Sequence, residues 1–192
     1  MLMLMKFQIP YILLILLISK AKTMRIVVQR VKSASVSVEG RVISSIGPGI
    51  LGLVGIHEHD SEADVDYCVR RLLGCKLWAN PDGKPWRHSV TQKDYELLLV
   101  SQFTLYGTLS KRHQPDYKQS MKNTPAKALY ETFLNKLRHC YHASKILDGE
   151  FGAMMDVSLV NDGPVTIMIE SEPEQPSEAS MQSDIADIDT SI

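Results

Sequence analysis

Three strand-like segments come before the first helical pattern, and this order limits the possible folds more than any other feature of the chain. The segments are RIVVQRV (residues 25–31), ASVSVEGRVISSIG (34–47) and GILGLVGI (49–56). Each is apolar or alternates polar with apolar residues, and Glu39-Gly40 and Gly47-Pro48-Gly49 mark turns. Strands that follow one another without a helix between them argue against regular strand–helix alternation, which is typical of parallel α/β folds.

Two later segments have helical periodicity. Ser61 offers an N-terminal cap with Asp64 three residues later, and Gly74 ends this first segment. Thr124-Pro125 opens the second segment. The residues predicted to face the core are Val65, Cys68, Val69, Leu72 and Leu73 in the first helix, and Leu129, Phe133, Leu137 and Cys140 in the second. We expect each helix to pack one apolar face onto a sheet.

Further strand-like segments lie between and after these helices. CKLWANPDGKPW (75–86) is typical of a hairpin that turns at Asp82-Gly83, and YELLLVSQFTL (95–105) is typical of a central strand. The last two, MMDVSLV (154–160) and TIMIE (166–170), flank NDGPVT, in which Asp162-Gly163 is a strong two-residue hairpin signal. The sequence therefore predicts a single α+β domain with a largely antiparallel, barrel-like sheet and two packed helices.

The composition fits one folded domain between two added ends. The 192 residues are 44% hydrophobic and 22% charged, which is ordinary for a globular domain with a substantial core. The formal net charge is -1, whereas residues 24–170 carry 18 Lys and Arg against 16 Asp and Glu, a balance of +2. That balance is too small to indicate nucleic-acid binding by itself.

Residues 1–23 and 172–192 are expected to lie outside the domain, which would span 24–171. The apolar run from Ile9 to Ile18 is shorter than the roughly 20 residues that a membrane-spanning helix requires. It fits either a secretory signal, with Ser19-Lys20-Ala21 as its cleavage site, or translation from an upstream start. Met24 opens a well-formed strand on either interpretation. The acidic, Ser-rich tail is expected to remain disordered.

The cysteines and histidines give weak signals for disulfide or metal chemistry. Cys68, Cys75 and Cys140 form an odd count without a C-x-x-C pair, which favours free thiols and a reducing, cytoplasmic location. Cys68 and Cys140 are expected to be core thiols. His57-Glu58-His59 and His139-Cys140-x-His142 do not form a known ligand motif, so we predict solvated histidines and neither a metal site nor a cofactor.

Two segments combine polar groups with strand patterns, while the sequence lacks the signatures of P-loop, dinucleotide-binding and serine hydrolase sites. SQFTL (101–105) ends the most apolar strand with two hydroxyls and an amide, which fits either a pocket or a strand that emerges into solvent. In NDGPVT (161–166), Pro164 cannot donate a ladder hydrogen bond. The segment is therefore either a rigid hairpin end or a displayed functional loop.

Together these segments carry a family resemblance. In this order and at these separations, MRIVVQRV, SQFTL, QPDY and FGAMMDVSLVNDGPVT resemble D-aminoacyl-tRNA deacylase, a family of chiral-proofreading enzymes, over about residues 24–171. A related animal family that edits other mischarged tRNAs differs at the start of SQFTL and after the Gly-Pro pair, so Ser101 and Val165 favour the chiral branch. The resemblance implies hydrolysis of the ester that joins a D-amino acid to the terminal ribose of tRNA.

The resemblance also implies how the enzyme selects its substrate. In such enzymes the Gly-Pro peptide is cis, and the two subunits of a homodimer exchange these loops. Gly163 and Pro164 would reach into the partner's pocket, bind the α-amino group through main-chain carbonyls and obstruct an L side chain, while D-aminoacyl and glycyl esters would enter. Arg30 would hold the inserted loop through its guanidinium group.

By the same resemblance, Ser101, Gln102 and Phe103 line the pocket, and backbone N–H groups near Phe103 and Thr104 face the developing oxyanion. Thr166 has been considered a nucleophile in such families, but no histidine accompanies it in the sequence. We therefore expect the 2′-hydroxyl of the substrate ribose to assist hydrolysis, with Thr166 as a positioning residue.

The segment after SQFTL is basic. Its charged residues are Lys111, Arg112, Lys118, Lys122 and Lys127, with the single acid Asp116. We expect this segment to contact phosphates of the tRNA acceptor stem, although a solvated loop and helix face would have the same composition. Two other functions remain open at this point, a non-catalytic RNA-binding module and a zinc-dependent hydrolase.

Overall fold

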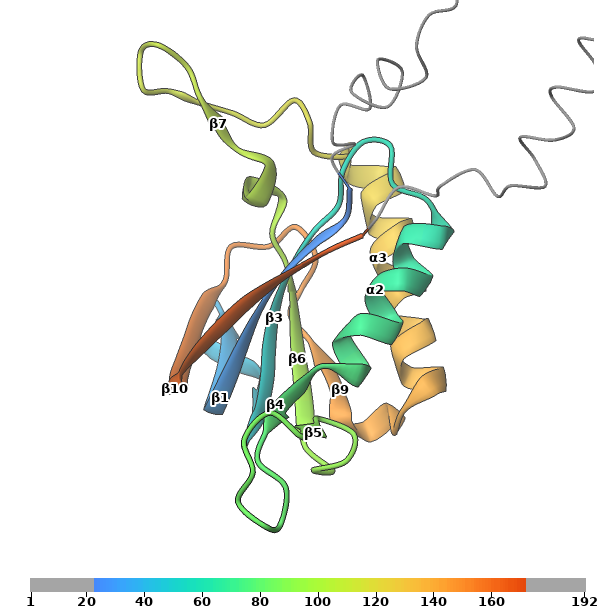
Figure 1. Cartoon of the computed structure of the whole chain (residues 1–192). Helices are drawn as coiled ribbons and strands as arrows, with labels where there is room; N and C mark the ends of the chain where they lie inside the picture. Colours follow the sequence, from blue (N-terminus) through green and yellow to red (C-terminus); the bar gives the residue numbers. More distant parts are fainter. Residues whose placement is uncertain (1–22, 172–192) are drawn as a thin grey trace, which may run out of the picture.

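The computed structural model describes residues 23–171, which form a curved β-sheet with two helices packed against it (Figure 1). The expectations for a leader and an acidic tail concern residues 1–22 and 172–192, which lie outside the described residues. Within residues 23–171, no helix is long and apolar enough to cross a membrane.

The elements follow the order expected from the sequence, with three strands before any helix. The strands are β1 (Arg25–Val38), β2 (Arg41–Ile46), β3 (Gly49–Gly55), β4 (Lys76–Trp78), β5 (His88–Ser89), β6 (Glu96–Ser101), β7 (Thr108–Leu109), β8 (Pro115–Asp116), β9 (Ile146–Asp148) and β10 (Asp156–Glu170). The α-helices are α2 (Glu62–Gly74) and α3 (Asn123–Cys140), and the 3₁₀ helices are η1 (Phe103–Tyr106) and η2 (Ala143–Lys145).

The main sheet has the order β10-β1-β3-β6-β9, and β2 also pairs with β1. The three neighbours of β1 are antiparallel to it. The pairs β3–β6 and β6–β9 are parallel, and α2 and α3 provide the crossover connections that parallel strands need. The Ser44 hydroxyl in β2 donates to the Asp148 carbonyl in β9 (2.6 Å), so the sheet curls back toward its own edge. The predicted α+β fold with a barrel-like sheet and two helices is confirmed, and its sheet is mixed.

Apolar side chains on both faces of the sheet form the core. Leu97 and Leu99 of β6 face α2 and α3, whereas Leu98 and Val100 lie in a second cluster inside the curl of the sheet. This division follows the two-residue period of a strand, and it makes β6 a strand that is buried on both faces. The rigid end of such a strand is a suitable place for a functional site.

Most of the residues predicted for the buried faces of the two helices are buried in the structure. The Asp64 carboxylate accepts the Ser61 N–H (2.9 Å), which confirms the predicted N-terminal cap of α2. In α3, Phe133 and Leu137 are buried as predicted. The prediction for Cys140 was wrong, because this last residue of α3 is exposed in a groove between the helices. The three cysteines are all unpaired in the described structure.

NDGPVT does not form the predicted hairpin. Residues 156–170 form one strand, and both flanks of the motif pair with β1, with Asn161 opposite Val31 and Thr166 opposite Gln29. The flanks of a hairpin would pair with each other. Residues 162–165 instead protrude where the register of the β1–β10 ladder shifts, and we call them the Gly-Pro loop.

The predicted strand through SQFTL is also shorter than expected. β6 ends at Ser101, and after Gln102 donates its N–H to the Val54 carbonyl (2.7 Å) the chain turns into η1. By contrast, the hairpin predicted around Asp82-Gly83 is confirmed by the antiparallel pairing of β4 and β5, with Gly83 at a φ of 78°.

Candidate functional site

A pocket of about 350 Å³ opens at the C-terminal end of β6. Its walls come from the end of β3, the β6–η1 turn, the segment before α3, the first turn of α3 and the loop after β9. Three of the predicted site residues, Ser101, Gln102 and Phe103, line it. Of the two interpretations of SQFTL, a pocket and a strand that emerges into solvent, the structure favours the pocket.

Hydrogen bonds and ring contacts fix the shape of this wall. The Gln102 side-chain amide donates to the Thr104 hydroxyl, and the Ser120 hydroxyl donates to the Phe103 carbonyl (2.7 Å). The Phe103 ring packs edge-to-face on Tyr117, with 5.0 Å between ring centroids, and 57% of Phe103 remains exposed. An accessible aromatic surface thus forms one side of the pocket entrance.

The turn after β6 also presents main-chain donors. Phe103 and Thr104 are the first two residues of η1, where backbone N–H groups have no acceptor within the helix. The Thr104 side chain is exposed and is not part of the pocket wall. The predicted role of Thr104 therefore depends on its backbone N–H group and not on its hydroxyl.

The pocket wall is suited to binding and orienting a ligand by hydrogen bonds. Its described residues include hydroxyl, amide, aromatic and aliphatic side chains, and no carboxylate, imidazole, amine or thiol is among them. A hydrolytic reaction here would have no side-chain general base with a pKa near neutrality.

Sequence reasoning missed part of the wall. Tyr117, Asn123 and Phe151 line the pocket, but no site role was predicted for them. Two of these residues lie within the segments that carry the family resemblance, Tyr117 in QPDY and Phe151 in FGAMMD. An aromatic residue within two positions of Gly or Pro in such a motif was the available signal.

The prediction of solvated histidines was wrong for His57, which is buried next to the pocket. His57 forms a β-bridge with the pocket residue Ser120, and its N–H donates to the Asp60 carboxylate (2.6 Å). Burial raises the pKa of Asp60 to about 7, and the hydrogen bond from His57 only partly opposes this shift. Burial also raises the pKa of Tyr106, whose hydroxyl donates to the Thr23 carbonyl.

The other predicted site residues gather around the Gly-Pro loop. The Arg30 Nε lies 3.0 Å from Asp162 Oδ2 and donates to the Asp162 carbonyl (3.2 Å), and Arg30 Nη1 donates to the Leu77 carbonyl. The peptide bond between Gly163 and Pro164 is cis, and both residues are exposed. Gly163 has a φ of 121°, which L side chains rarely adopt.

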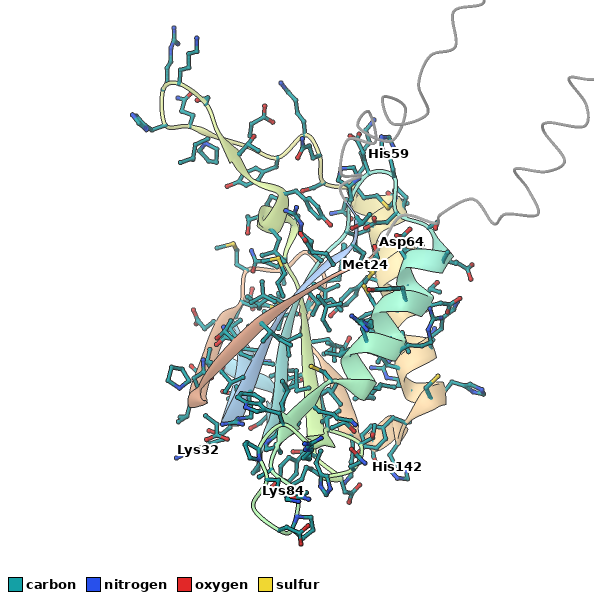
Figure 2. The ribbon with its side chains drawn as sticks, viewed as in Figure 1. Met24, Lys32, His59, Asp64, Lys84 and His142 are labelled. Atoms are coloured by element: carbon teal, nitrogen blue, oxygen red, sulfur yellow. The ribbon has the colours of Figure 1, made fainter. Side chains whose placement is uncertain are left out.

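The structure does not bring these two groups together within one chain. Thr166 in β10 is opposite Gln29 in β1, and Gln29 is opposite Leu51 in β3. Leu51 is in turn opposite Leu98 in β6, three residues before Ser101. Since β10 and β6 are three strands apart at about 4.8 Å each, roughly 14 Å separates them across the sheet alone. Figure 2 shows the two ends of the molecule, with Lys32 of β1 at one and His59 at the other.

The predicted phosphate-binding residues lie on the arm after η1 and on the segment between this arm and α3, which also supplies part of the pocket wall. Strands β7 and β8 form an arm that projects away from the sheet (Figure 1), and Lys111 and Arg112 are exposed between them. Lys118 follows the arm and pairs with Asp116 (3.2 Å), and its backbone N–H is the main cause of the lowered pKa of that carboxyl. Lys122 immediately precedes α3.

The histidines and cysteines do not assemble a recognisable metal centre in residues 23–171. There, no group of three or more His, Cys, Asp or Glu side chains is arranged to hold a metal ion. His139 and Cys140 line a groove between α2 and α3 together with Lys136.

Comparison with known proteins gives consistent matches. The sequence model of the family described as "D-Tyr-tRNA(Tyr) deacylase" matches residues 27–170. The chain is 49% identical over 150 residues to a "D-aminoacyl-tRNA deacylase" of Dictyostelium discoideum, covering 78% of this chain and 99% of that one. It is 51% identical over 152 residues to a protein of the same description from Drosophila melanogaster, covering 79% and 94%.

A human relative and two solved structures extend these matches. "D-aminoacyl-tRNA deacylase 1" of Homo sapiens is 46% identical over 148 residues, covering 77% of this chain and 70% of its own. The structure of a "c-Myc DNA Unwinding Element Binding Protein" is 44% identical, with a TM-score of 0.75 over 78% of this chain and 99% of that one. That of a "probable eukaryotic D-amino acid tRNA deacylase" is similar in fold, with a TM-score of 0.67 at 19% identity over 77% and 99%.

Proposed function

Because the chain belongs to the D-Tyr-tRNA(Tyr) deacylase family, we propose that it is a hydrolase that cleaves the ester bond of D-aminoacyl-tRNA. The products are a free D-amino acid and tRNA. The observation that carries this proposal is the pocket at the end of β6, because Ser101, Gln102 and Phe103 line it within the matched region. Its volume of about 350 Å³ suits a small ligand such as an aminoacylated adenosine end.

Hydrolysis in this pocket uses the substrate's own hydroxyl. The ribose 2′-hydroxyl assists a water molecule that attacks the ester carbonyl, the bond between the carbonyl carbon and the ribose oxygen breaks, and that oxygen leaves with a proton. The absence of a general base among the described wall residues supports this route. The N–H groups of Phe103 and Thr104 stabilise the oxyanion, and the Gln102 amide keeps the turn in shape.

Chiral selection comes from the Gly-Pro loop of a second subunit. In this proposal Gly163 and Pro164 enter the partner's pocket, bind the α-amino group and obstruct an L side chain, so that D-aminoacyl and glycyl esters react. The separation of the loop from the pocket within one chain supports an exchanged homodimer. Arg30 holds the loop, and Val165 packs against the core beneath it. Thr166 is a positioning residue, whose hydroxyl accepts a long hydrogen bond from Asn161 (3.5 Å).

Phosphates of the tRNA are bound beside the pocket entrance. The exposed Lys111 and Arg112 of the arm, with Lys118 and Lys122, supply positive charge near the pocket residues Tyr117 and Ser120. The catalytic domain spans residues 24–171. Because its substrate takes part in translation and its three cysteines are unpaired, we propose that it acts in the cytoplasm.

The proposal is tested by incubating the full chain with D-tyrosyl-tRNA, L-tyrosyl-tRNA and glycyl-tRNA in buffer that contains a chelator. We expect rapid release of D-tyrosine and glycine and an intact L ester. The Phe103→Ala variant should be strongly impaired, since it removes the aromatic side of the pocket, whereas Leu109→Ala on the arm should retain the activity as a matched exposed control. If no ester is cleaved while tRNA still binds, the chain is a non-catalytic RNA-binding module. Activity that is lost in chelator and restored by zinc would instead favour a metal-dependent hydrolase.

A further inference from the structure

The β4–β5 loop (residues 79–87) places an exposed tryptophan next to Arg30. The Arg30 guanidinium carbon lies 5.9 Å from the centroid of the Trp86 ring, a geometry for a cation–π contact. The same guanidinium donates to the carbonyl of Leu77, in β4. The β4–β5 hairpin therefore contacts Arg30 twice, through the Trp86 ring and through the Leu77 carbonyl.

The conformation of Trp86 is unusual for a tryptophan. Its φ is 58°, a left-handed backbone that bulky residues rarely adopt, and 54% of the residue is exposed. Burial in the core therefore does not account for the ring at this position. A bulky side chain held in an uncommon backbone conformation at the surface indicates a role beyond packing.

The loop that presents Trp86 is well anchored. The Arg87 N–H donates to the Trp78 carbonyl (2.8 Å), and the Asn80 N–H donates to the Lys84 carbonyl (3.0 Å). Trp78 is buried and packs edge-to-face on Tyr95, with 5.4 Å between ring centroids. The backbone on either side of Trp86 is thus anchored, and the ring offers a surface against which the long Arg30 side chain can be ordered.

Arg30 in turn lies directly against the Gly-Pro loop. A Cβ atom placed on Gly163 would come within 3.1 Å of Arg30 Nη2, and Arg30 Nε is bound to Asp162 through both its carboxylate and its carbonyl. A shift of the guanidinium would therefore move the backbone at Gly163 or leave it unsupported. The contacts thus run from Trp86 to Arg30 and from Arg30 to Asp162 and Gly163.

We propose that Trp86 is a positioning residue that fixes Arg30 and thereby the conformation of the Gly-Pro loop. Trp86 touches none of the reacting atoms. Its consequence for catalysis rests on the proposed function, in which the Gly-Pro loop discriminates between D and L esters. Loss of the ring would then reduce this discrimination as well as the rate, because a less ordered loop admits the L side chain more readily.

The test compares Trp86→Ala and Trp86→Phe with Lys84→Ala, an exposed control in the same loop that Figure 2 labels. Hydrogen–deuterium exchange is measured on the full chain for peptides that cover residues 160–167. We expect Trp86→Ala to accelerate exchange at the Gly-Pro loop about two- to fivefold, the range that corresponds to loss of one exposed cation–π contact. Trp86→Phe, which retains an aromatic face, should restore most of the protection, and Lys84→Ala should match the parent protein.

Activity provides the second measurement. The ratio of D-tyrosyl-tRNA to L-tyrosyl-tRNA hydrolysis should fall in Trp86→Ala and recover in Trp86→Phe, whereas a merely stabilising residue would leave this ratio unchanged. Unchanged exchange at residues 160–167 in Trp86→Ala overturns the inference, whatever the activity. If the parent protein cleaves no D ester, the proposed function fails, and the exchange data still decide whether Trp86 positions the loop.

Discussion

At the scale of single residues, the ionisation of Asp60 makes the stability of the fold next to the pocket depend on pH. Its carboxylate accepts the backbone N–H of His57, which forms an isolated β-bridge with Ser120, and Asp64 adds a nearby like charge. The raised pKa of Asp60, about 7 against 3.8, means that the folded protein holds a proton that the unfolded chain releases above about pH 4. The stability contributed by protonated Asp60 is fully present below about pH 4 and is lost as the pH rises to about 7.

Replacement of Asp60 by Asn should remove this dependence, because a neutral amide still accepts the His57 N–H and does not ionise. Relative to the parent protein, Asp60→Asn should gain about 1–2 kcal/mol in free energy of unfolding between pH 4.5 and pH 8, less than the full shift because solvent partly reaches the site. Urea denaturation at several pH values measures this difference. The exposed Glu131→Gln on α3 is the control, and parallel pH profiles for Asp60→Asn and the parent protein would contradict the assignment.

At the scale of elements, the close approach of β3 and β6 depends on a residue without a side chain. Gly49 begins β3 opposite Glu96, where the parallel pairing with β6 starts. A Cβ atom at Gly49 would lie 2.0 Å from the Glu96 carbonyl oxygen, which belongs to the backbone and cannot rotate away. The start of the ladder that leads to the pocket therefore requires glycine.

Gly49→Ala should therefore lower the free energy of unfolding by about 3 kcal/mol or more, as expected for overpacking against backbone. Gly74→Ala is the matched control, because a Cβ at this last residue of α2 would meet nothing within 4 Å. The control should be neutral or slightly stabilising, because alanine restricts the unfolded chain more than glycine does. Thermal and chemical denaturation of both variants measure the contrast, and equal stabilities would show that β3 and β6 can separate without cost.

Elements with local signals were predictable from the sequence, and elements defined by distant partners were not. The cap of α2 depends on Ser61 and Asp64, three residues apart, and both helices were found. NDGPVT was misassigned because its flanks pair with β1, more than 120 residues earlier, which no local pattern reveals. In the pocket, Ser101 and Gln102 stood out as polar interruptions of an apolar strand, and Phe103 was named through the family resemblance. Phe151 reaches the pocket from the loop after β9, a strand that is placed by its pairing with β6.

At the scale of the whole molecule, the proposed function divides the site between two ends of the domain. The pocket lies at the end of β6, and the Gly-Pro loop lies at the register shift of β1 and β10. In a two-fold symmetric pair, each end can meet the other end of its partner, and two equivalent sites result. One complete site then needs an intact pocket from one subunit and an intact loop from the other.

This arrangement predicts rescue between two impaired variants. Phe103→Ala damages the pocket and Arg30→Ala damages the support of the loop, so each variant alone should be strongly impaired. When the two are co-expressed, half of the dimers are mixed and one of their two sites is intact, so about a quarter of the parent activity should return. Measurement of D-tyrosyl-tRNA hydrolysis and sedimentation of the mixture tests this. A monomeric species, or a mixture no more active than its parts, would exclude an exchanged dimer.

The first and last described residues of the domain are hydrogen-bonded to each other, so the chain could be joined there. The Thr23 hydroxyl donates to the Ser171 carbonyl, and the Ser171 N–H donates to the Met24 carbonyl (2.9 Å). The described polypeptide therefore begins and ends at the same place in the fold. A circular permutant, with its ends joined there and new termini opened in a loop elsewhere, would keep every strand beside its present neighbours.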